Sequence, residues 1–389
     1  MITTDSYGRA IGERTYSGAA TRKMLLVAQA MRSVGLRTIV VSLPFVGTGA
    51  RCFWFSSVVI SEGRVPAVFT ATLRSPVLRK LVGPVFPLIF FLRHARRGDT
   101  VICYNHALEY LPSQLALRLR GVKLVQDIED APIAQERGFR GHLNRFTFAV
   151  TFRLTAARKM VVADHVAEGL GLNDFVSIRG VAAQEIDLGL STNNAKWGEL
   201  KSGGPLKLHY GGTLIAETGV ELFCKAVEQL AQNVGRLARP VNFRITGVGN
   251  FHKIRALQDR VREVRAIEVE VFQELDKLDY LRIIDACHGS LSLKRPGSAM
   301  SNTTFPSKVI EITGAGLALV SARFGDVAEI FVNDTAFFLN AYNAEELAKT
   351  IVTMAEDPVR VEKVAAAGRR LCNEFFSLDA VGVEMTRLI

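Results

Sequence analysis

Residues 302–321 read NTTFPSKVIEITGAGLALVS, a pattern that predicts a helix followed directly by a buried strand. Pro306 suits the first turn of a helix, because the N–H group that proline lacks would have no partner there. Ser307 and Lys308 then lie in that first turn, where free backbone N–H groups and the positive helix end favour an anion. Glu311 follows one turn later, on the same face as Lys308.

The predicted helix, residues 306–313, ends at glycines and gives way to a strand at 317–321. A phosphate site next to a carboxylate that can accept two ribose hydroxyls would form a sugar-nucleotide pocket. An ordinary helix start with a Lys–Glu pair on the surface explains the same local pattern. The rest of the sequence has to decide between these two interpretations.

Length and charge narrow the class of protein. The chain has 389 residues, which is too long for one ordinary core and predicts two domains. Hydrophobic residues make up 48% of it, so we expect a folded globular protein. The net charge of +10 suits an anionic substrate, an anionic membrane surface or nucleic acid, and no nucleic-acid-binding motif supports the third.

The cysteines and the N-terminus indicate a reducing compartment. Residues 1–7 lack the apolar segment of a signal peptide, and no apolar run reaches the length that spans a bilayer. We therefore expect a cytoplasmic protein, either free or peripheral at the inner face of the membrane. Five scattered cysteines read as core thiols, not as a disulfide framework or a zinc site: Cys52, Cys103, Cys224, Cys287 and Cys372.

The first half, residues 1–183, begins as a β–loop–α–β unit of a doubly wound α/β domain. A short strand at 1–4, a glycine-containing loop, a helix at 17–34 and a strand at 38–43 form this unit. Residues 58–70 include further strand. The later elements are strands at 100–104, 122–127 and 159–163 and helices at 108–119 and 146–154.

Residues 75–97 combine basic side chains with the apolar run 81–92, which contains Pro84 and Pro87. One interpretation is a buried helix interrupted by prolines. The other is a patch that rests on anionic lipid and inserts aromatic side chains. The basic residues are Arg79, Lys80, Arg93, Arg96 and Arg97, and the candidates for insertion are Phe86, Phe90 and Phe91.

A polar, glycine-rich linker at 184–205 separates the first half from a second α/β domain at 206–375. Alternating strands and helices there predict a parallel sheet covered on both faces. A last helical segment, 376–389, is expected to return to the first domain. The predicted strands are 206–210, 241–246, 268–272, 289–293, 317–321 and 335–339, and the helices are 220–232, 251–264, 275–288, 306–313 and 344–355.

Four motifs recur in a fixed order along the second half and resemble the nucleotide-binding domain of family 4 glycosyltransferases. These are the retaining, bacterial-type glycosyl transferases of group 1, which have the GT-B fold. The resemblance implies an α/β chain with two Rossmann-like, doubly wound parallel-sheet domains that face each other across a cleft. The motifs are Tyr210-Gly211-Gly212-Thr213-Leu214, Thr218-Gly219-Val220, Gly247-Val248-Gly249, and Phe305-Pro306-Ser307-Lys308 with Glu311, Gly325-Asp326 and Glu329.

The resemblance implies transfer of a sugar, as a hexosyl group, from a UDP- or GDP-sugar to a glycan or lipid-linked acceptor. The anomeric configuration would be retained in front-face transfer, in which the departing phosphate helps to deprotonate the acceptor. Such enzymes serve cell-surface polysaccharide or glycoconjugate synthesis. The residues implied in donor binding are Gly18, Gly211, Gly212, Thr213, Gly247, Gly249, Lys294, Arg295, Ser301, Asn302, Thr303, Thr304, Ser307, Lys308 and Glu311.

This chain departs from the family pattern at the donor site. The first glutamate of Glu-x7-Glu would fall at Thr303, and the usual Arg and Lys near the first loop would fall at Thr213 and at Glu217-Thr218. The phosphate charge would then fall to Lys308, assisted by Lys294 or Arg295 and by backbone amides.

Candidate residues of the first half follow two predicted strands, at the carboxyl end where α/β sheets bind ligands. His106 follows one strand, and Asp127-Ile128-Glu129-Asp130 follows the next. By resemblance, Glu129 takes the place of a histidine that binds the donor sugar. Loop charges, helix caps and a loop histidine would explain the same residues. The candidate catalytic residues are Glu129, His106, Lys308 and Glu311.

Other chemistries lack their motifs. No Asp-x-Asp occurs to hold a divalent metal, so we expect neither a metal nor another cofactor, and there is no Gly-x-Ser-x-Gly or Walker A motif. A sugar-nucleotide epimerase would need an acid–base pair that is not apparent. A non-catalytic homologue, binding sugar nucleotide or scaffolding a glycan-assembly complex, is supported by the departures at the donor site.

Overall fold

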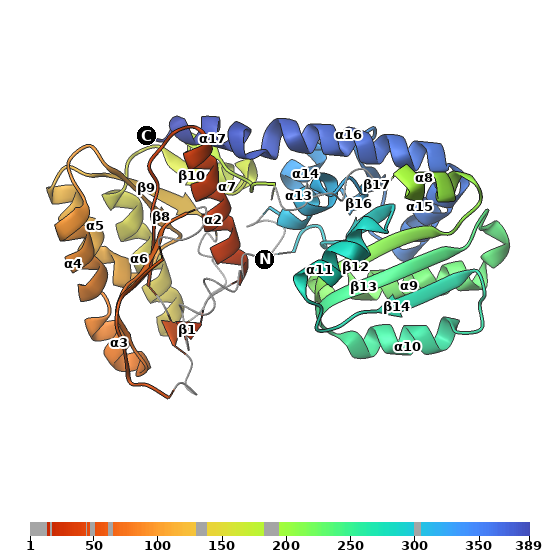
Figure 1. The fold of residues 1–389 in the computed structure, drawn as a ribbon, viewed down its shortest axis with the longest axis horizontal. Helices are drawn as coiled ribbons and strands as arrows, with labels where there is room; N and C mark the ends of the chain where they lie inside the picture. Colours follow the sequence, from red (N-terminus) through yellow and green to blue (C-terminus); the bar gives the residue numbers. More distant parts are fainter. Residues whose placement is uncertain are drawn as a thin grey trace. The chain divides into compact units, whose positions relative to one another are not determined.

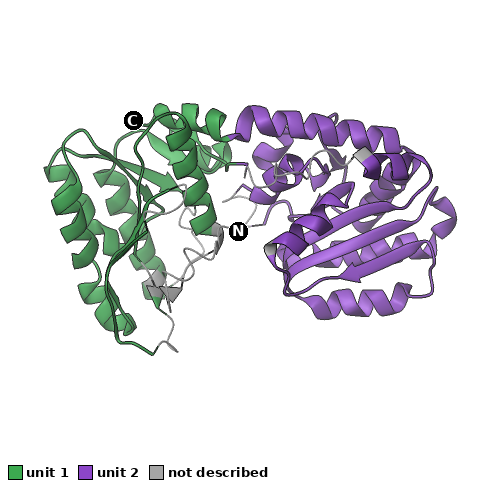
Figure 2. Ribbon diagram, viewed as in Figure 1, with its two compact units in different colours: residues 1–181, 378–389 green, residues 182–377 purple. Residues whose placement is uncertain are grey.

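The computed structural model describes residues 14–15, 18–43, 45–46, 51–60, 65–129, 138–182, 194–298 and 305–389. Two compact units divide the chain, one formed by residues 1–181 with 378–389 and the other by 182–377 (Figure 2). The predicted strand at 1–4, Asp130 and residues 301–304 lie outside the described residues.

The second unit contains a six-stranded sheet in which every neighbouring pair is parallel (Figure 1). The strand order is β14-β13-β12-β15-β16-β17, so the order reverses between β12 and β15. This is the doubly wound order, and it confirms the parallel sheet predicted from the alternating pattern. The strands are β12 Leu206–Leu214, β13 Val241–Gly249, β14 Ile267–Val271, β15 Gly289–Ser292, β16 Ala318–Ala322 and β17 Phe337–Leu339.

Several helices of the second unit bury an apolar face in the core formed with this sheet. Helix α9 shows the pattern most clearly, because Val220, Phe223, Val227 and Leu230 follow helical spacing and are all buried. Phe223 stacks on Tyr210 of β12 with ring centroids 4.7 Å apart, and burying such a side chain contributes about 2–3 kcal/mol. The helices are α8 Asn194–Lys201, α9 Val220–Gln232, α10 Phe251–Val261, α11 Lys277–Asp285, α13 Ser307–Gly314, α14 Gly325–Ile330, α15 Ala344–Glu356 and α16 Pro358–Phe376, with short 3₁₀ turns η4 Ala216–Thr218 and η5 Val234–Arg236.

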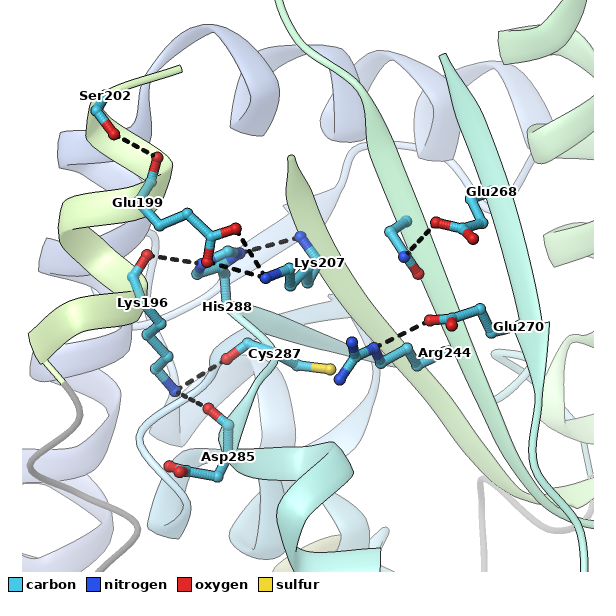
Figure 3. Close-up of polar contacts among 11 residues, drawn as sticks. Lys196, Glu199, Ser202, Lys207, Arg244, Glu268, Glu270, Asp285, Cys287 and His288 are labelled. Atoms are coloured by element: carbon cyan, nitrogen blue, oxygen red, sulfur yellow. Dashed lines mark hydrogen bonds and ion pairs between the residues drawn. The ribbon is translucent and has the colours of Figure 1, made fainter. Parts of the chain in front are cut away.

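Helix α8 lies inside the polar, glycine-rich stretch 184–205 that was predicted to be a linker and for which no helix was predicted. Lys196 of α8 donates hydrogen bonds to the carbonyls of Asp285 (3.0 Å), the last residue of α11, and Cys287 (2.9 Å), which follows it (Figure 3). A cation suits this position, because carbonyls at a helix C-terminus carry partial negative charge. The short polar helix is therefore held by tertiary contacts that its own composition does not reveal.

His288 completes the attachment of α8 to the sheet (Figure 3). Its Nδ1 accepts a hydrogen bond from the backbone N–H of Lys207 (3.0 Å), and its Nε2 lies 3.1 Å from the carbonyl of Lys196. Since Nδ1 is an acceptor, the proton of the neutral ring is on Nε2. Both bonds lie where β12 and β15 begin, at the edge of the sheet opposite the carboxyl ends.

The first unit contains a four-stranded parallel sheet of order β11-β10-β9-β8. The preceding strands, β1 to β7, form three smaller sheets. Strand β6 pairs in parallel with β2 but antiparallel with β5, and two further pairs, β1–β3 and β4–β7, are antiparallel. The first half is thus less regular than the wholly parallel sheet expected. The strands are β1 Arg14–Thr15, β2 Val40–Ser42, β3 Phe45–Val46, β4 Trp54–Phe55, β5 Val58–Ile60, β6 Ala67–Phe69, β7 Thr72–Leu73, β8 Thr100–Tyr104, β9 Lys123–Ile128, β10 Lys159–Val161 and β11 Phe175–Ser177.

The C-terminal helix α17, Leu378–Thr386, packs on α2, Gly18–Ser33, within the first unit (Figure 1). A Cβ atom added at Gly382 would lie 2.3 Å from the carbonyl oxygen of Ala30, so only glycine permits this approach. The other helices of this unit are α3 Pro76–Val82, α4 Val85–His94, η1 Leu108–Tyr110, α5 Leu111–Leu119, α6 Gly138–Leu154 and α7 Asp164–Gly169.

All five cysteines are free thiols, and every one except Cys52 is buried. Burial raises the pKa of Cys103 to about 11, which keeps this thiol protonated and unreactive. Among the described helices, none combines the length and the apolar character needed to cross a membrane.

Candidate functional site

The predicted donor-binding residues of the second unit gather at the carboxyl ends of β12, β13 and β15. Gly211 and Gly212 lie near the end of β12, and Lys294 and Arg295 follow β15 directly. Because β12 and β15 are neighbours where the strand order reverses, these residues flank the switch point of the sheet. Open α/β sheets bind their ligands in the crevice at this position.

The two glycine segments lie side by side as paired strands, whereas the predicted strands ended before the glycines, at 210 and 246. Gly212 pairs with Gly247 in the register of β12 and β13, and their φ angles are +107° and +122°. A Cβ atom at Gly247 would lie 1.9 Å from the carbonyl oxygen of Gly212. The strands therefore continue through the glycines, because two side-chain-free backbones can approach where larger residues would clash.

Lys308 reaches from the first turn of α13 to the end of β12. Its Nζ donates a hydrogen bond to the carbonyl of Gly211, and a Cβ atom at Gly212 would lie 2.7 Å from that Nζ. Pro306 precedes the helix as its N-cap residue. Burial lowers the pKa of Lys308, while the nearby carboxylate of Glu311 opposes this change. The structure thus places an ammonium group, a helix N-terminus and a glycine backbone together.

The remaining predicted donor residues differ in accessibility. Lys294 is buried, and burial lowers its pKa to about 8. Arg295 and Ser307 are exposed, while Glu311 is half-buried. The backbone N–H of Arg295 donates to the carbonyl of Glu217 (2.9 Å), which ties the loop after β15 to the loop after β12. Four further residues that were predicted to bind the donor lie outside the described residues: Ser301, Asn302, Thr303 and Thr304.

Thr218 occupies one of the places where the family has a basic residue, and its hydroxyl holds the loop together. The Thr218 hydroxyl donates to the carbonyl of Thr213 and accepts a hydrogen bond from the N–H of Ile215 (3.1 Å). Thr213 itself is exposed, and its carbonyl also accepts from Ile215 N–H at 3.2 Å. This loop therefore offers a compact backbone turn without a cation.

His209 was not predicted and forms a buried polar layer directly beneath the glycines. Its ring nitrogens lie 2.8 Å from the hydroxyl of Ser290 on β15 and 2.8 Å from that of Thr246 on β13. Burial, with the nearby charge of Lys308, lowers its pKa well below the usual value, so the ring is neutral. The sequence signal was a histidine immediately before Tyr210-Gly211-Gly212, inside an otherwise apolar strand.

The candidate residues of the first unit also lie at carboxyl ends of neighbouring strands. Asn105, which has a φ of +55°, donates from its N–H to the carbonyl of Asp127 (2.8 Å) and accepts from the N–H of Glu129 (3.0 Å). An asparagine tolerates this left-handed conformation better than most residues. Asn105 thus links the end of β8 to the end of β9 and brings His106 and Glu129 to the same edge.

Both predicted side chains at this edge have partners within the first unit. Glu129 forms an ion pair with Lys23 of α2, and each of these side chains is 14% exposed. His106 Nε2 lies 2.6 Å from Asn144 Oδ1 of α6, and its ring meets Phe148 edge-on with centroids 5.2 Å apart. The carboxylate is therefore neutralised by a lysine that the sequence did not single out. Gly18 is the first residue of α2.

Comparison with known structures identifies the architecture. The chain is similar to a glycosyltransferase from Rickettsia africae, with a TM-score of 0.65 and 13% identity over 96% of this chain and 94% of that one. Sucrose-phosphate synthase from Thermosynechococcus elongatus has a TM-score of 0.64, 15% identity and coverage of 93% and 90%. The Anabaena protein HepE, in complex with UDP, has a TM-score of 0.64, 14% identity and coverage of 95% of both chains. The chain has the GT-B fold.

Residues 221–385 match the family model described as glycosyl transferase-like. This match confirms the group 1-like resemblance on the part of the chain that carries Gly247, Lys308 and Glu311. No curated protein matches the sequence significantly. Over the described residues, no group of three or more His, Cys, Asp or Glu side chains is arranged to hold a metal ion.

Proposed function

We propose that the protein is a retaining glycosyltransferase that moves a sugar, as a hexosyl group, from a UDP- or GDP-sugar to a glycan or lipid-linked acceptor. The observation that carries the proposal is the contact of Lys308 with the glycine backbone at the strand switch point. The glycosyl transferase-like match and the fold support it. Among proteins of similar structure, HepE is known in complex with UDP and with UDP-glucose.

The donor diphosphate would lie on Lys308 and the first turn of α13, and the carboxylate of Glu311 would accept the ribose hydroxyls. Lys308 would stabilise the charge that develops on the leaving phosphate, which is the usual role of a preorganised cation at a transferred group. Lys294 or Arg295 would assist from the end of β15. The missing Asp-x-Asp motif supports transfer without a metal ion.

In the first unit, Lys23, Glu129 and Asn105 would form the surface that receives sugar hydroxyls. Carboxylate and amide oxygens accept hydrogen bonds from hydroxyls, and Lys23 forms an ion pair with Glu129. His106, which lies at the same edge of the sheet, would help to position Glu129. We propose that the reaction serves cell-surface polysaccharide or glycoconjugate synthesis, in the cytoplasm or at the inner face of the membrane.

A second candidate is a non-catalytic homologue that binds sugar nucleotide or scaffolds a glycan-assembly complex. The observation that favours it is the use of the Thr218 hydroxyl within the loop, where the family has a base. Such a protein would bind the nucleotide and release no nucleoside diphosphate from the sugar nucleotide.

Thermal-shift measurements with UDP, GDP, ADP and their common sugar nucleotides, without metal, test the donor site. A ligand that binds only the native state stabilises it by about 2.7 kcal/mol at a concentration one hundred times its Kd. We expect one base to raise the melting temperature of the wild type but not of Glu311→Ala. The matched control is Glu345→Ala, on the first turn of α15 and distant in the chain from the site.

The outcome separates the two candidates. A shift accompanied by release of nucleoside diphosphate in the presence of a glycan or lipid-linked acceptor supports the transferase. A shift without release under any acceptor condition favours the non-catalytic homologue. Equal shifts in the wild type and Glu311→Ala would contradict the role given to Glu311, and no shift with any nucleotide would contradict the donor site.

A further inference from the structure

Helices α3 and α4 expose most of their apolar side chains. None of the seven residues of α3 is buried, and α4 buries only Pro87. Leu81 is 70% exposed and Val77 is 67% exposed, although both are large aliphatic residues. We call the seven exposed residues the α3–α4 face: Val77, Leu78, Leu81, Val82, Val85, Ile89 and Leu92.

The exposed apolar residues follow helical spacing on each of the two successive helices. Val77, Leu78, Leu81 and Val82 follow the i, i+1, i+4, i+5 pattern on α3, and Val85, Ile89 and Leu92 follow i, i+4, i+7 on α4. Each set therefore lies on one side of its helix. Single exposed apolar residues are ordinary, but a contiguous set marks an interaction surface.

The phenylalanines of this stretch, which were the predicted candidates for membrane insertion, point elsewhere. Phe86 meets Trp54 edge-on with ring centroids 5.2 Å apart, and Phe91 packs against the buried cluster of Ala95, Leu117 and Val122. Phe90 lies against His94 at 4.7 Å. All three phenylalanines are half-buried. Phe86 and Phe91 attach α4 to the unit, whereas the ring contacts of Phe90 are with Phe91 and His94 of α4 itself.

Positive charge surrounds the α3–α4 face. Lys80, Arg93, Arg96 and Arg97 are exposed, whereas Arg79 is half-buried and donates to the carbonyl of Val46 at 3.4 Å. Residues 75–98 contain no aspartate or glutamate. Asp99 follows this stretch, and its carboxylate accepts a hydrogen bond from the backbone N–H of Arg96 (2.8 Å). Apolar helices with basic residues and no acidic residue of their own have the composition that binds the interface of an anionic bilayer.

We propose that the α3–α4 face docks the protein on the surface of an anionic lipid bilayer. Aliphatic side chains enter the boundary between headgroups and acyl chains, and the four exposed basic residues contact lipid phosphates. Trp54, which is 48% exposed and contacts Phe86, lies next to α4 and adds an aromatic residue of the kind enriched at membrane interfaces.

The charge pattern favours lipid over a second copy of the chain. A symmetric dimer contact would place the same surface on both subunits, so the basic edges of the two copies would repel each other. A bilayer with acidic headgroups offers the opposite charge along the whole face. Docking also gives the exposed apolar side chains of α3 a partner, since they are covered at the membrane.

Co-sedimentation with phosphatidylcholine vesicles, with and without phosphatidylglycerol, tests the proposal. Wild-type protein is expected to bind only vesicles that contain phosphatidylglycerol, and more weakly as salt is added. Arg93→Glu/Arg96→Glu/Arg97→Glu should lower the partition coefficient by more than a hundredfold, since each basic residue near an anionic surface contributes about fivefold. Leu81→Asp/Ile89→Asp should abolish the binding that remains at high salt.

Control variants carry one substitution of each type on exposed residues of other helices. Leu278→Asp, on α11 at 64% exposure, and Lys349→Glu, on α15, should bind vesicles as the wild type does. Equal binding by the wild type and both α3–α4 variants would overturn the proposal. So would a wild-type dimer that Leu81→Asp/Ile89→Asp converts to a monomer, because the face would then bind a second copy.

The vesicle experiment is independent of the donor site. No nucleotide is present, and unchanged melting temperatures show that the variants fold, so failure of either proposal leaves the other standing. Because all substituted residues are exposed, the fold should tolerate them within about 0.5 kcal/mol per site.

Discussion

The ammonium group of Lys308, in the first turn of α13, donates a hydrogen bond to the backbone carbonyl of Gly211 near the end of β12. These two residues are 97 positions apart in the sequence, and the contact forms where the order of the sheet reverses. Burial lowers the pKa of Lys308, and an anion that takes the place of the carbonyl would favour the charged form. The contact thus holds the Lys308 side chain at the position where a phosphate group of the donor would bind.

Lys308→Met should weaken binding of the nucleoside diphosphate that the thermal screen identifies. A hydrogen bond to a charged group contributes about 1.5–3 kcal/mol, which corresponds to a loss of affinity of roughly ten- to hundredfold. Titration calorimetry with the diphosphate and with the corresponding nucleoside measures the effect. Only the diphosphate should lose affinity, because the nucleoside has no phosphate for Lys308.

Lys349→Met is the matched control for this substitution, since Lys349 is an exposed lysine of α15. It should bind both ligands as the wild type does. A nucleoside that loses as much affinity as the diphosphate would show that Lys308 shapes the pocket without contacting phosphate.

Gly247→Ala should destabilise the second unit by about 3 kcal/mol or more. The added Cβ atom would lie 1.9 Å from the carbonyl oxygen of Gly212, and the φ of +122° is unfavourable for alanine. Urea denaturation measures the difference. Gly235→Ala is the control, because a Cβ atom there meets nothing within 4 Å, and it should change stability by less than about 1 kcal/mol. Similar values for both variants would refute the close approach.

Much of the second unit was predictable because its helices and strands have a clear period. Helix α9 was predicted at its observed bounds, and β12 begins at the predicted Leu206. The pattern could not show that β12 continues through Gly211 and Gly212, because glycine favours turns until another backbone pairs with it. That partner, Gly247 on β13, is distant in the sequence.

The candidate site was predictable where neighbours in the sequence share a helix face, as Lys308 and Glu311 do. Contacts between distant segments were not. Lys23 carries no local signal that it neutralises Glu129, and His209 resembles an ordinary strand residue until Ser290 and Thr246 lie beside it. Helix α8 was missed for the same reason, since its attachment depends on residues of the sheet.

Glu129→Gln separates the structural role of Glu129 from a role at the sugar. Removing one partner of the ion pair with Lys23 should destabilise the first unit by about 1–3 kcal/mol, because the remaining charge is largely buried. The double variant Lys23→Met/Glu129→Gln should recover part of this loss. Urea denaturation of the wild type, Glu129→Gln, Lys23→Met and the double variant measures the coupling between the two residues.

Turnover of the same proteins then tests the sugar contact. If Glu129 accepts a sugar hydroxyl, kcat/KM with a sugar nucleotide should fall at least tenfold in Glu129→Gln and stay low in the double variant, although its stability recovers. Activity that returns together with stability would instead assign Glu129 a purely structural role.

His288 should make the stability of the second unit depend on pH. It is fully buried, and burial lowers its pKa to about 4, whereas the unfolded chain binds this proton near pH 6.5. Between these values the unfolded state binds more protons, so the free energy of unfolding falls as pH falls from 6.5 to 4, by about 3 kcal/mol, and levels off below 4. Urea denaturation across this range should show a shallower slope for His288→Asn than for the wild type, while His252→Asn, at an exposed histidine, keeps the wild-type slope. Parallel curves for the wild type and His288→Asn would mean that protonation of His288 does not oppose folding, which would contradict the acceptor role of its Nδ1 toward the N–H of Lys207.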